Sequence, residues 1–201
     1  MFFLTNTFKS RNGDLQMNDL KIKLTKVVNN ISKMGYLPNS QQNPQHEDGV
    51  KWELEECGFV EDIDFVSQPN GKQKFPDFHI LDDDGNVVLE LECKSATKKK
   101  PMWNRGLPKP DALYIVCSRQ LGRTTIFFGE SVLPRKTFDR LMKIDKDIKA
   151  QVNMINDEHD DGWINYPRLA FDNRGDNSPN YWDRSYIDIV LSKLDTLDVR
   201  V

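Results

Sequence analysis

Two carboxylates and a lysine stand at a spacing that could bring them together: a short segment alternates apolar and charged side chains, and a turn precedes it. The segment VVLELECK at residues 87–94 alternates apolar and charged side chains. Successive side chains of a strand point to opposite faces, so Glu90, Glu92 and Lys94 share one face. The turn sequence DDDGN folds the preceding segment, which contains Asp77, back beside this strand. We therefore expect Asp77 and Glu92 to converge with Lys94 beside them.

This set of side chains suits phosphodiester hydrolysis. In that reaction the attacking water loses a proton, the transition state gains negative charge, and the leaving oxygen must be neutralised. Carboxylates are hard oxygen ligands that hold Mg²⁺ without removing all of its water. A lysine can orient or deprotonate the attacking water and adds positive charge against the phosphate. We interpret Asp77 and Glu92 as ligands of Mg²⁺ and Lys94 as their catalytic partner.

Each of these residues also has a plain structural interpretation. Asp77 alone fits the turn at the start of a strand, and Lys94 alone fits a solvated surface. Glu90 is best interpreted as a supporting or solvated group. His79 shares a strand face with Asp77, but an isolated histidine is more often structural than catalytic.

The surrounding elements form a predicted single domain over 1–201, divided into 1–46, a catalytic core at 47–117, and 118–201. Apolar periodicity predicts a helix over 17–34, with Asn18 as its N-cap and Gly35 as its stop. A second helix is predicted near 46–59, ending at Gly58. A third, from Pro134 to about Asn156, is expected to pack on the sheet, and a final short element lies near 184–197.

The strand predictions lie in the middle of the chain. Three segments separated by tight turns, at about 62–68, 76–81 and 87–94, predict an antiparallel meander. The continuous apolar run DALYIVCS predicts a strand buried on both faces, and TTIFFG a fifth strand. The chain is therefore expected to adopt an α/β (α+β) fold with a central mixed sheet of about five strands flanked by helices.

Charge is divided unevenly along the chain, although the net charge is only -3. Residues 46–92 carry 14 acidic and 3 basic side chains, whereas residues 93–143 carry 12 basic and 3 acidic ones. An acidic segment suited to cations thus precedes a basic segment suited to phosphate. Ordinary solvated faces remain an alternative interpretation of both segments.

A basic loop follows the catalytic lysine directly, and we interpret it as a contact with double-stranded DNA. Lysines there suit phosphate, asparagine and arginine suit base edges, and a tryptophan can stack on bases or wedge between them. A packed tryptophan in a solvated loop is the alternative. The candidate residues are Lys98, Lys99, Lys100, Trp103, Asn104, Arg105 and Lys109.

The irregular segment 157–183 provides a second candidate DNA surface. It mixes aromatic, amide and basic side chains without a clear period. We select Arg168, Asn173 and Arg174, although neighbouring aspartates could neutralise the two arginines as surface pairs.

Cysteine and histidine usage argues against a soft metal centre. Cys57, Cys93 and Cys117 are odd in number and lack the paired spacing of a zinc site, so they are expected to be buried thiols. The three histidines are equally scattered. No apolar run approaches the ~20 residues of a membrane helix, and the opening residues do not resemble a secretion signal. We expect a cytoplasmic protein with no membrane partner.

At this point the sequence resembles the PD…(D/E)xK nuclease superfamily. Pro76-Asp77 and Glu92-Cys93-Lys94 match the motif, with Phe75 beside it. Residues 49–53 look like the G-x-x-aromatic-E element on the first active-site helix of many such enzymes. The resemblance covers roughly residues 47–117. It implies Glu53 as a further catalytic carboxylate, with Glu55 or Glu56 as alternatives, and the main-chain carbonyl of Cys93 as a metal ligand.

The segment PMWNRGLPKPDALYIV is similar to small type II restriction endonucleases, including those of large algal viruses. This narrower resemblance implies a restriction-endonuclease-like fold, Mg²⁺-dependent in-line attack by water, and 5′-phosphate products. It also implies a two-fold symmetric homodimer on palindromic DNA and a companion DNA methyltransferase acting on the same site. The alternatives are a structure-specific repair or recombination nuclease with the same centre, a noncatalytic DNA-binding protein, and a structural or interaction domain.

Overall fold

The computed structural model describes most of the chain. The described residues are 6–37, 45–103, 106–158, 164–165, 167, 171–172 and 179–197, and side chains are described from residue 18 onward within these ranges, residue 45 excepted.

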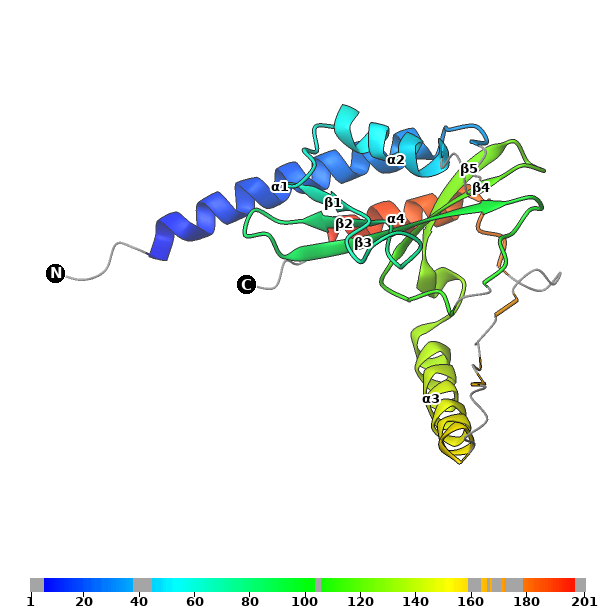
Figure 1. Ribbon diagram of the computed structural model, residues 1–201. Helices are drawn as coiled ribbons and strands as arrows, with labels where there is room; N and C mark the ends of the chain where they lie inside the picture. Colours follow the sequence, from blue (N-terminus) through cyan, green and yellow to red (C-terminus); the bar gives the residue numbers. More distant parts are fainter. Residues whose placement is uncertain are drawn as a thin grey trace.

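The centre of the molecule is a five-stranded mixed sheet (Figure 1). Its strands are adjacent in chain order, and all neighbours are antiparallel except β3 and β4, which are parallel. This confirms the predicted α+β fold and the meander of the first three strands. The strands are β1 (Phe65–Ser67), β2 (Phe78–Leu81), β3 (Val87–Ala96), β4 (Leu113–Ser118) and β5 (Arg123–Phe128).

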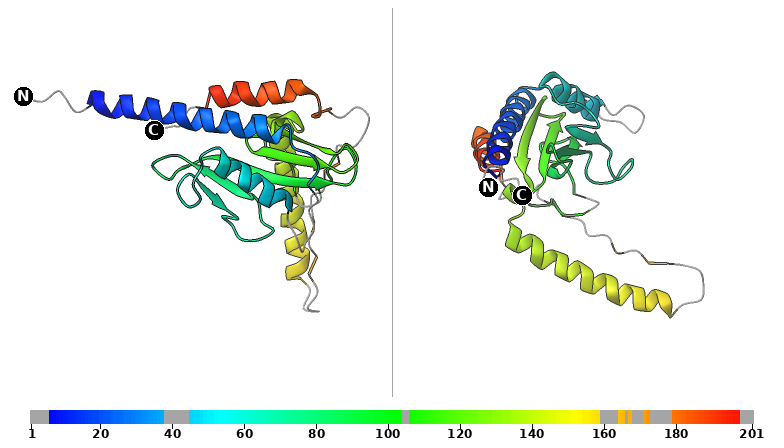
Figure 2. Two further views of the ribbon diagram at one scale, coloured as in Figure 1. Left: turned by 90° about the horizontal axis from the view of Figure 1, so that it is seen from above. Right: turned by 90° about the vertical axis from the view of Figure 1, so that its left-hand side faces the viewer.

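Helices cover one face of the sheet. The core there combines apolar side chains of three helices, α1 (Asn6–Ile31), α2 (Gln45–Glu56) and α4 (Arg184–Asp195), with Leu89, Leu91 and Cys93 of β3. In Figure 2, α1 and α4 run side by side over this face. The alternation of β3 therefore leaves Glu90, Glu92 and Lys94 on the opposite face, as predicted.

An aromatic cluster covers part of that opposite face. Tyr114 of β4 and Phe127 of β5 pack against Trp103, Tyr181 and Trp182 from segments distant in sequence. The Trp103 and Tyr114 rings meet edge to face with centroids 4.8 Å apart. Because β4 is packed by helices on one side and aromatics on the other, all of its residues are buried, as the continuous apolar run predicted.

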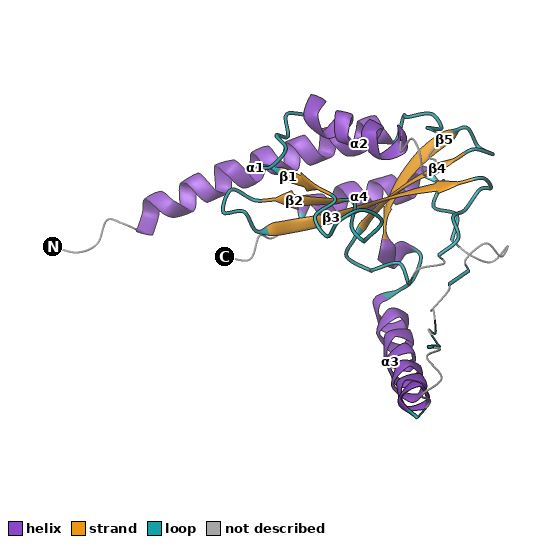
Figure 3. Cartoon of the chain, in the orientation of Figure 1, coloured by secondary structure: helices purple, strands orange, loops and turns teal. Residues whose placement is uncertain are grey.

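Two helix predictions need correction. The first helix begins at Asn6, so Asn18 is inside it and is not an N-cap. The third helix, α3 (Arg135–Asp157), does not pack on the sheet. Figures 2 and 3 show it projecting away from the sheet, and α4 covers the sheet instead. Within the described part of the chain, no helix has the length and apolar content needed to cross a membrane.

Candidate active site

Asp77 lies where β2 separates from β3. Its backbone N–H donates to Leu91 O at 3.0 Å, and its carboxylate Oδ2 accepts the backbone N–H of Cys93 at 2.7 Å. Pro76 has no N–H to continue the ladder, so the Asp77 side chain takes the place of the next strand residue. Asp77 is 7% exposed and is therefore fixed beside β3.

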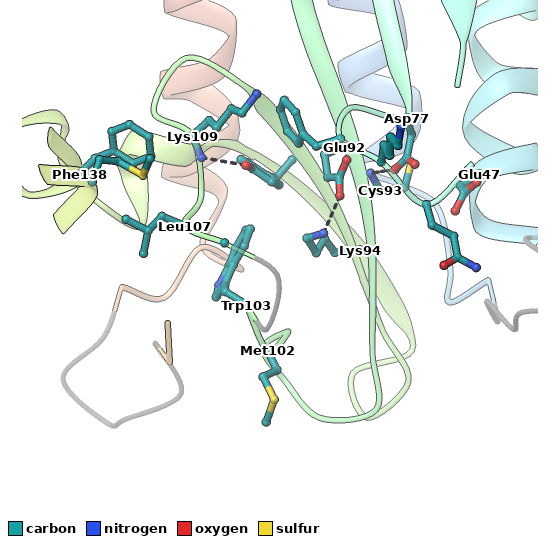
Figure 4. Close-up of a pocket in the computed structure, with 16 residues that line it drawn as sticks. Glu47, Asp77, Glu92, Cys93, Lys94, Met102, Trp103, Leu107, Lys109 and Phe138 are labelled. Carbon is teal, nitrogen blue, oxygen red and sulfur yellow. Dashed lines mark hydrogen bonds and ion pairs between the residues drawn. The ribbon is translucent and has the colours of Figure 1, made fainter. Parts of the chain in front are cut away.

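Glu92 and Lys94 form the second part of the site. Lys94 Nζ donates to Glu92 Oε1 at 2.6 Å, with both side chains on the face of β3 that points away from the helices (Figure 4). Glu92 Oε2 is buried and has no hydrogen-bond partner among the described residues. Lys94 Nζ also lies 5.8 Å from the centroid of the Trp103 ring. The structure thus brings Asp77, Glu92 and Lys94 together, as the sequence predicted.

Burial controls the protonation of the two carboxyl groups. It raises the pKa of Asp77, against the opposing hydrogen bond from Cys93 and the charge of Lys94. Burial also raises the pKa of Glu92, opposed by Lys94 and assisted by the negative charge of Asp77. Burial of both carboxyl groups and the negative charge of Asp77 beside Glu92 therefore favour the protonated forms when no cation is bound.

Glu47 is the third carboxylate of the cleft, in the first turn of α2. Gln68 Nε2 lies between the two sides of the site, donating to Glu47 Oε2 at 3.1 Å and to Asp77 Oδ1 at 3.2 Å. Glu47 precedes the buried Val50 and Leu54 by three and seven residues, so it lies on the helix face that packs on the sheet. Neither Glu47 nor Gln68 is among the site residues expected from the sequence.

Glu53, which the family resemblance implies as the helix carboxylate, is not among the residues that line the cleft. It lies six residues from Glu47, about 9 Å along the helix at 1.5 Å per residue. Its charge acts on the Cys57 thiol instead. Glu55 and Glu56 are exposed on the same helix and do not line the cleft either. The sequence signal that could have identified Glu47 is its place in the acidic first turn of α2, three and seven residues before the apolar Val50 and Leu54.

The three carboxylates open into a cleft of about 650 Å³. Figure 4 shows Glu47 beyond Asp77 on one side and Phe138 on the other. The wall opposite the carboxylates is largely apolar and includes Phe138 and Met142, which belong to the first turns of α3. The cleft therefore has one charged side and one apolar side.

Lys109 and Glu90 lie beside this charged side. Lys109 lines the cleft, with Nζ 3.6 Å from the centroid of the Phe75 ring and 3.8 Å from Glu90 Oε2. Glu90 Oε1 lies 3.9 Å from His79 Nε2. Glu90 and His79 are not among the residues that line the cleft.

The basic loop after β3 is fixed by its backbone. The carbonyl of Lys98 accepts from Ser118 Oγ at 2.8 Å, and that of Lys99 from Trp182 Nε1 at 2.7 Å. The Lys98 and Lys99 side chains are exposed, whereas the Lys100 ammonium lies 6.0 Å from the Tyr181 ring centroid. These contacts hold the chain while leaving the first two lysines accessible.

Trp103 is 3% exposed, so it is the packed tryptophan of the alternative interpretation and cannot wedge between bases. Its backbone N–H and carbonyl pair with Phe171 at 3.3 and 2.9 Å. The two segments predicted to contact DNA therefore meet at this bridge. Asn104, Arg105, Arg168, Asn173 and Arg174 lie outside the described residues.

The donor set of the site suits a hard divalent cation. Asp77 and Glu92 supply carboxylate oxygens, and the unpartnered Glu92 Oε2 is the kind of buried anion that a cation stabilises. No group of three or more His, Cys, Asp or Glu side chains within the described ranges converges as a complete metal cage. Magnesium commonly binds proteins through one or two carboxylates together with water and substrate phosphates.

Comparison of the chain with protein family models, with curated proteins and with solved structures found no match.

Proposed function

We propose that this protein is a Mg²⁺-dependent endonuclease that hydrolyses phosphodiester bonds of double-stranded DNA. The observation that carries the proposal is the buried Glu92 Oε2, which has no partner among the described residues, together with Asp77 and Lys94. An uncompensated buried carboxylate oxygen is costly unless a cation or proton meets it. Its position at the charged side of an open cleft favours a cation.

The chain's own residues divide the work of hydrolysis. Asp77 and Glu92 would hold Mg²⁺, with the carbonyl of Cys93 as a further ligand implied by the family resemblance. The ion supplies positive charge against the phosphate and makes water a better nucleophile. Lys94, held by Glu92 Oε1 and facing Trp103, can donate its remaining N–H groups to a water or a phosphate oxygen. Glu47, through Gln68, keeps Asp77 oriented.

We further propose a site-specific type II restriction endonuclease that leaves 5′-phosphates and acts in the cytoplasm as a homodimer. The resemblance to such enzymes at Pro76-Asp77, Glu92-Cys93-Lys94 and the segment after them supports this narrower proposal. The exposed Lys98 and Lys99, on the loop between β3 and the cleft residue Met102, suit the DNA backbone. A companion methyltransferase acting on the same site would protect the host DNA.

Plasmid digestion tests the proposal. With Mg²⁺ the protein should give discrete fragments, and Asp77→Asn should give none while keeping its fold by circular dichroism. Asp83→Asn, at the exposed tip of the same hairpin, is the matched control and should cut like the parent. A smear in place of discrete fragments would favour a structure-specific nuclease. DNA binding without cleavage under any divalent metal would overturn the proposal and favour a noncatalytic binding protein.

A further inference from the structure

The helix α3 exposes an apolar stripe along most of its length. Ile144, Ile148 and Ile155 are 43, 44 and 46% exposed, and Leu141 continues the same stripe toward the sheet. Apolar side chains on a surface helix normally face the core, because burial stabilises them. This stripe instead faces solvent on a helix that projects from the rest of the molecule (Figure 1).

The spacing of the stripe is that of a helix pair. Leu141, Ile144, Ile148, Gln151 and Ile155 are separated by three, four, three and four residues. This is the a/d spacing by which two helices pack side chains into one another. Gln151 is the one polar member, and a single polar residue in such a seam selects one register at a cost in stability.

The neighbouring face of α3 is already occupied. Asp145 is 6% exposed, and its carboxylate accepts a hydrogen bond from Lys149 Nζ at 2.6 Å. Nearer the body, Phe138 and Met142 line the cleft. Near the other end, Asn156 exchanges two hydrogen bonds of 3.0 Å with the backbone of Asn165. The exposed stripe is thus separate from the helix faces that line the cleft and that contact Asn165.

Charge along α3 identifies the occupant of this surface. Residues 135–146 carry five basic and two acidic side chains, whereas residues 147–158 carry one basic and three acidic ones. A second copy of α3 running antiparallel would place the basic half of each helix beside the acidic half of the other. A parallel copy would place like charge beside like charge, which is unfavourable.

We propose that the Leu141–Ile155 stripe of α3 is a homodimer interface, in which α3 packs antiparallel against α3 of a second copy. The contact runs along a helix about 34 Å long, from the 1.5 Å rise per residue. Stable specific interfaces bury roughly 1,200–2,000 Å². A single helix pair is near or below that range, so the dimer dissociates on dilution. Pairing also steadies Phe138 and Met142, and hence one wall of each cleft.

Sedimentation velocity on the full chain without DNA or metal tests the interface. The mass should rise with concentration from 23.4 kDa toward twice that value. Ile148→Asp should raise the dissociation constant on the order of 100-fold, because two carboxylates would lie unpaired in an apolar contact. Ala150→Asp adds the same charge two residues away, off the stripe, and should dimerise like the parent. Ile155→Asp serves as a second seam variant if Ile148→Asp unfolds.

Cysteine cross-linking tests the orientation. Leu141→Cys protein mixed with Ile155→Cys protein should form a disulfide-linked pair, because both positions lie on the stripe and an antiparallel arrangement brings its opposite ends together. The three natural cysteines are buried and should contribute little background. Linking of Leu141→Cys protein to itself would overturn the antiparallel order. A chain that stays monomeric at all concentrations, or equal dimerisation of Ile148→Asp and Ala150→Asp, would overturn the interface. The readout is mass, so loss of the dimer and loss of nuclease activity are separate results.

Discussion

The ammonium of Lys94 binds one oxygen of Glu92 at 2.6 Å and leaves the other oxygen buried without a partner among the described residues. The pair has no net charge, but one oxygen of the Glu92 carboxylate has no hydrogen-bond donor among the described residues. Asp77, directly before the adjacent strand β2, adds a second negative charge that raises the pKa of Glu92 further. Ionisation of these carboxyl groups is therefore unfavourable in the metal-free protein, and a bound cation would remove this penalty. A metal site that is formed before the metal binds lowers the stability of the free protein in this way.

Glu92→Gln should stabilise the metal-free protein at pH 8. The amide can keep its oxygen toward Lys94 and removes the negative charge that burial disfavours. We expect a gain of about 1 kcal/mol in the free energy of unfolding, within the usual range for such site substitutions. Urea denaturation with EDTA measures it. An unchanged or lower unfolding free energy would show that Glu92 is adequately neutralised without a metal.

The same relationship fixes the sign of the pH dependence. Burial raises the pKa of Asp77 and Glu92 in the folded state. At pH values between the pKa of the unfolded state and the raised pKa of the folded state, the folded protein therefore binds more protons than the unfolded protein. Stability of the metal-free protein should therefore fall as pH rises from about 4.5 through the raised pKa values. Saturating Mg²⁺ should reverse the trend, since it binds the ionised carboxylates. Thermal melts across this pH range, with and without Mg²⁺, check both signs.

Glu47→Gln and Glu53→Gln form a matched pair on one helix. Glu47 lines the cleft and shares Gln68 with Asp77, whereas Glu53 does neither. Glu47→Gln should lower the cleavage rate by about 10- to 100-fold, the usual effect of losing a group that orients a metal ligand. Glu53→Gln should cleave at the parent rate. Single-turnover kinetics distinguish the two, and the opposite ranking would restore Glu53 as the functional carboxylate.

Two tryptophans test the packing behind Lys94. Trp103 is 3% exposed and contacts Tyr114, whereas Trp52 on α2 is 56% exposed. Trp103→Ala should reduce the free energy of unfolding by about 3–5 kcal/mol. Trp52→Ala should change it by no more than about 0.5 kcal/mol. Denaturant titration measures both, and a Trp103→Ala protein as stable as the parent would contradict the packed position of this ring.

The basic loop can be tested by the salt dependence of DNA binding. Replacing Lys98 and Lys99 by alanine should reduce the slope of log K against log salt concentration by about 2, as expected for the loss of two phosphate contacts. Lys26 lies in α1 and Lys33 lies just after its end, and both side chains are exposed. Helix α1 packs on the face of the sheet opposite to Glu92 and Lys94. Their double alanine variant should leave the slope unchanged. Equal slopes for both double variants would remove the loop from the DNA surface.

Much of this site follows from local sequence. The period-two alternation of residues 87–94 separates Glu92 and Lys94 from the core, and the DDDGN turn fixes the antiparallel return that brings Asp77 alongside. These patterns act over a few residues, so they hold wherever the strands are packed. Two of the strand pairings also follow, because short turns join β2 to β3 and β4 to β5.

Tertiary packing decided the rest. Which glutamate of α2 enters the cleft depends on the rotation of that helix against the sheet, and Val50 and Leu54 turn Glu47 inward in place of Glu53. The apolar periodicity of α3 predicts an amphipathic helix correctly but cannot name the surface that covers it. In this fold α4 occupies the sheet, so the exposed face of α3 remains available to a second chain. Apolar periodicity in the sequence shows that one face of a helix should be buried. Only the three-dimensional arrangement shows which surface that face packs against.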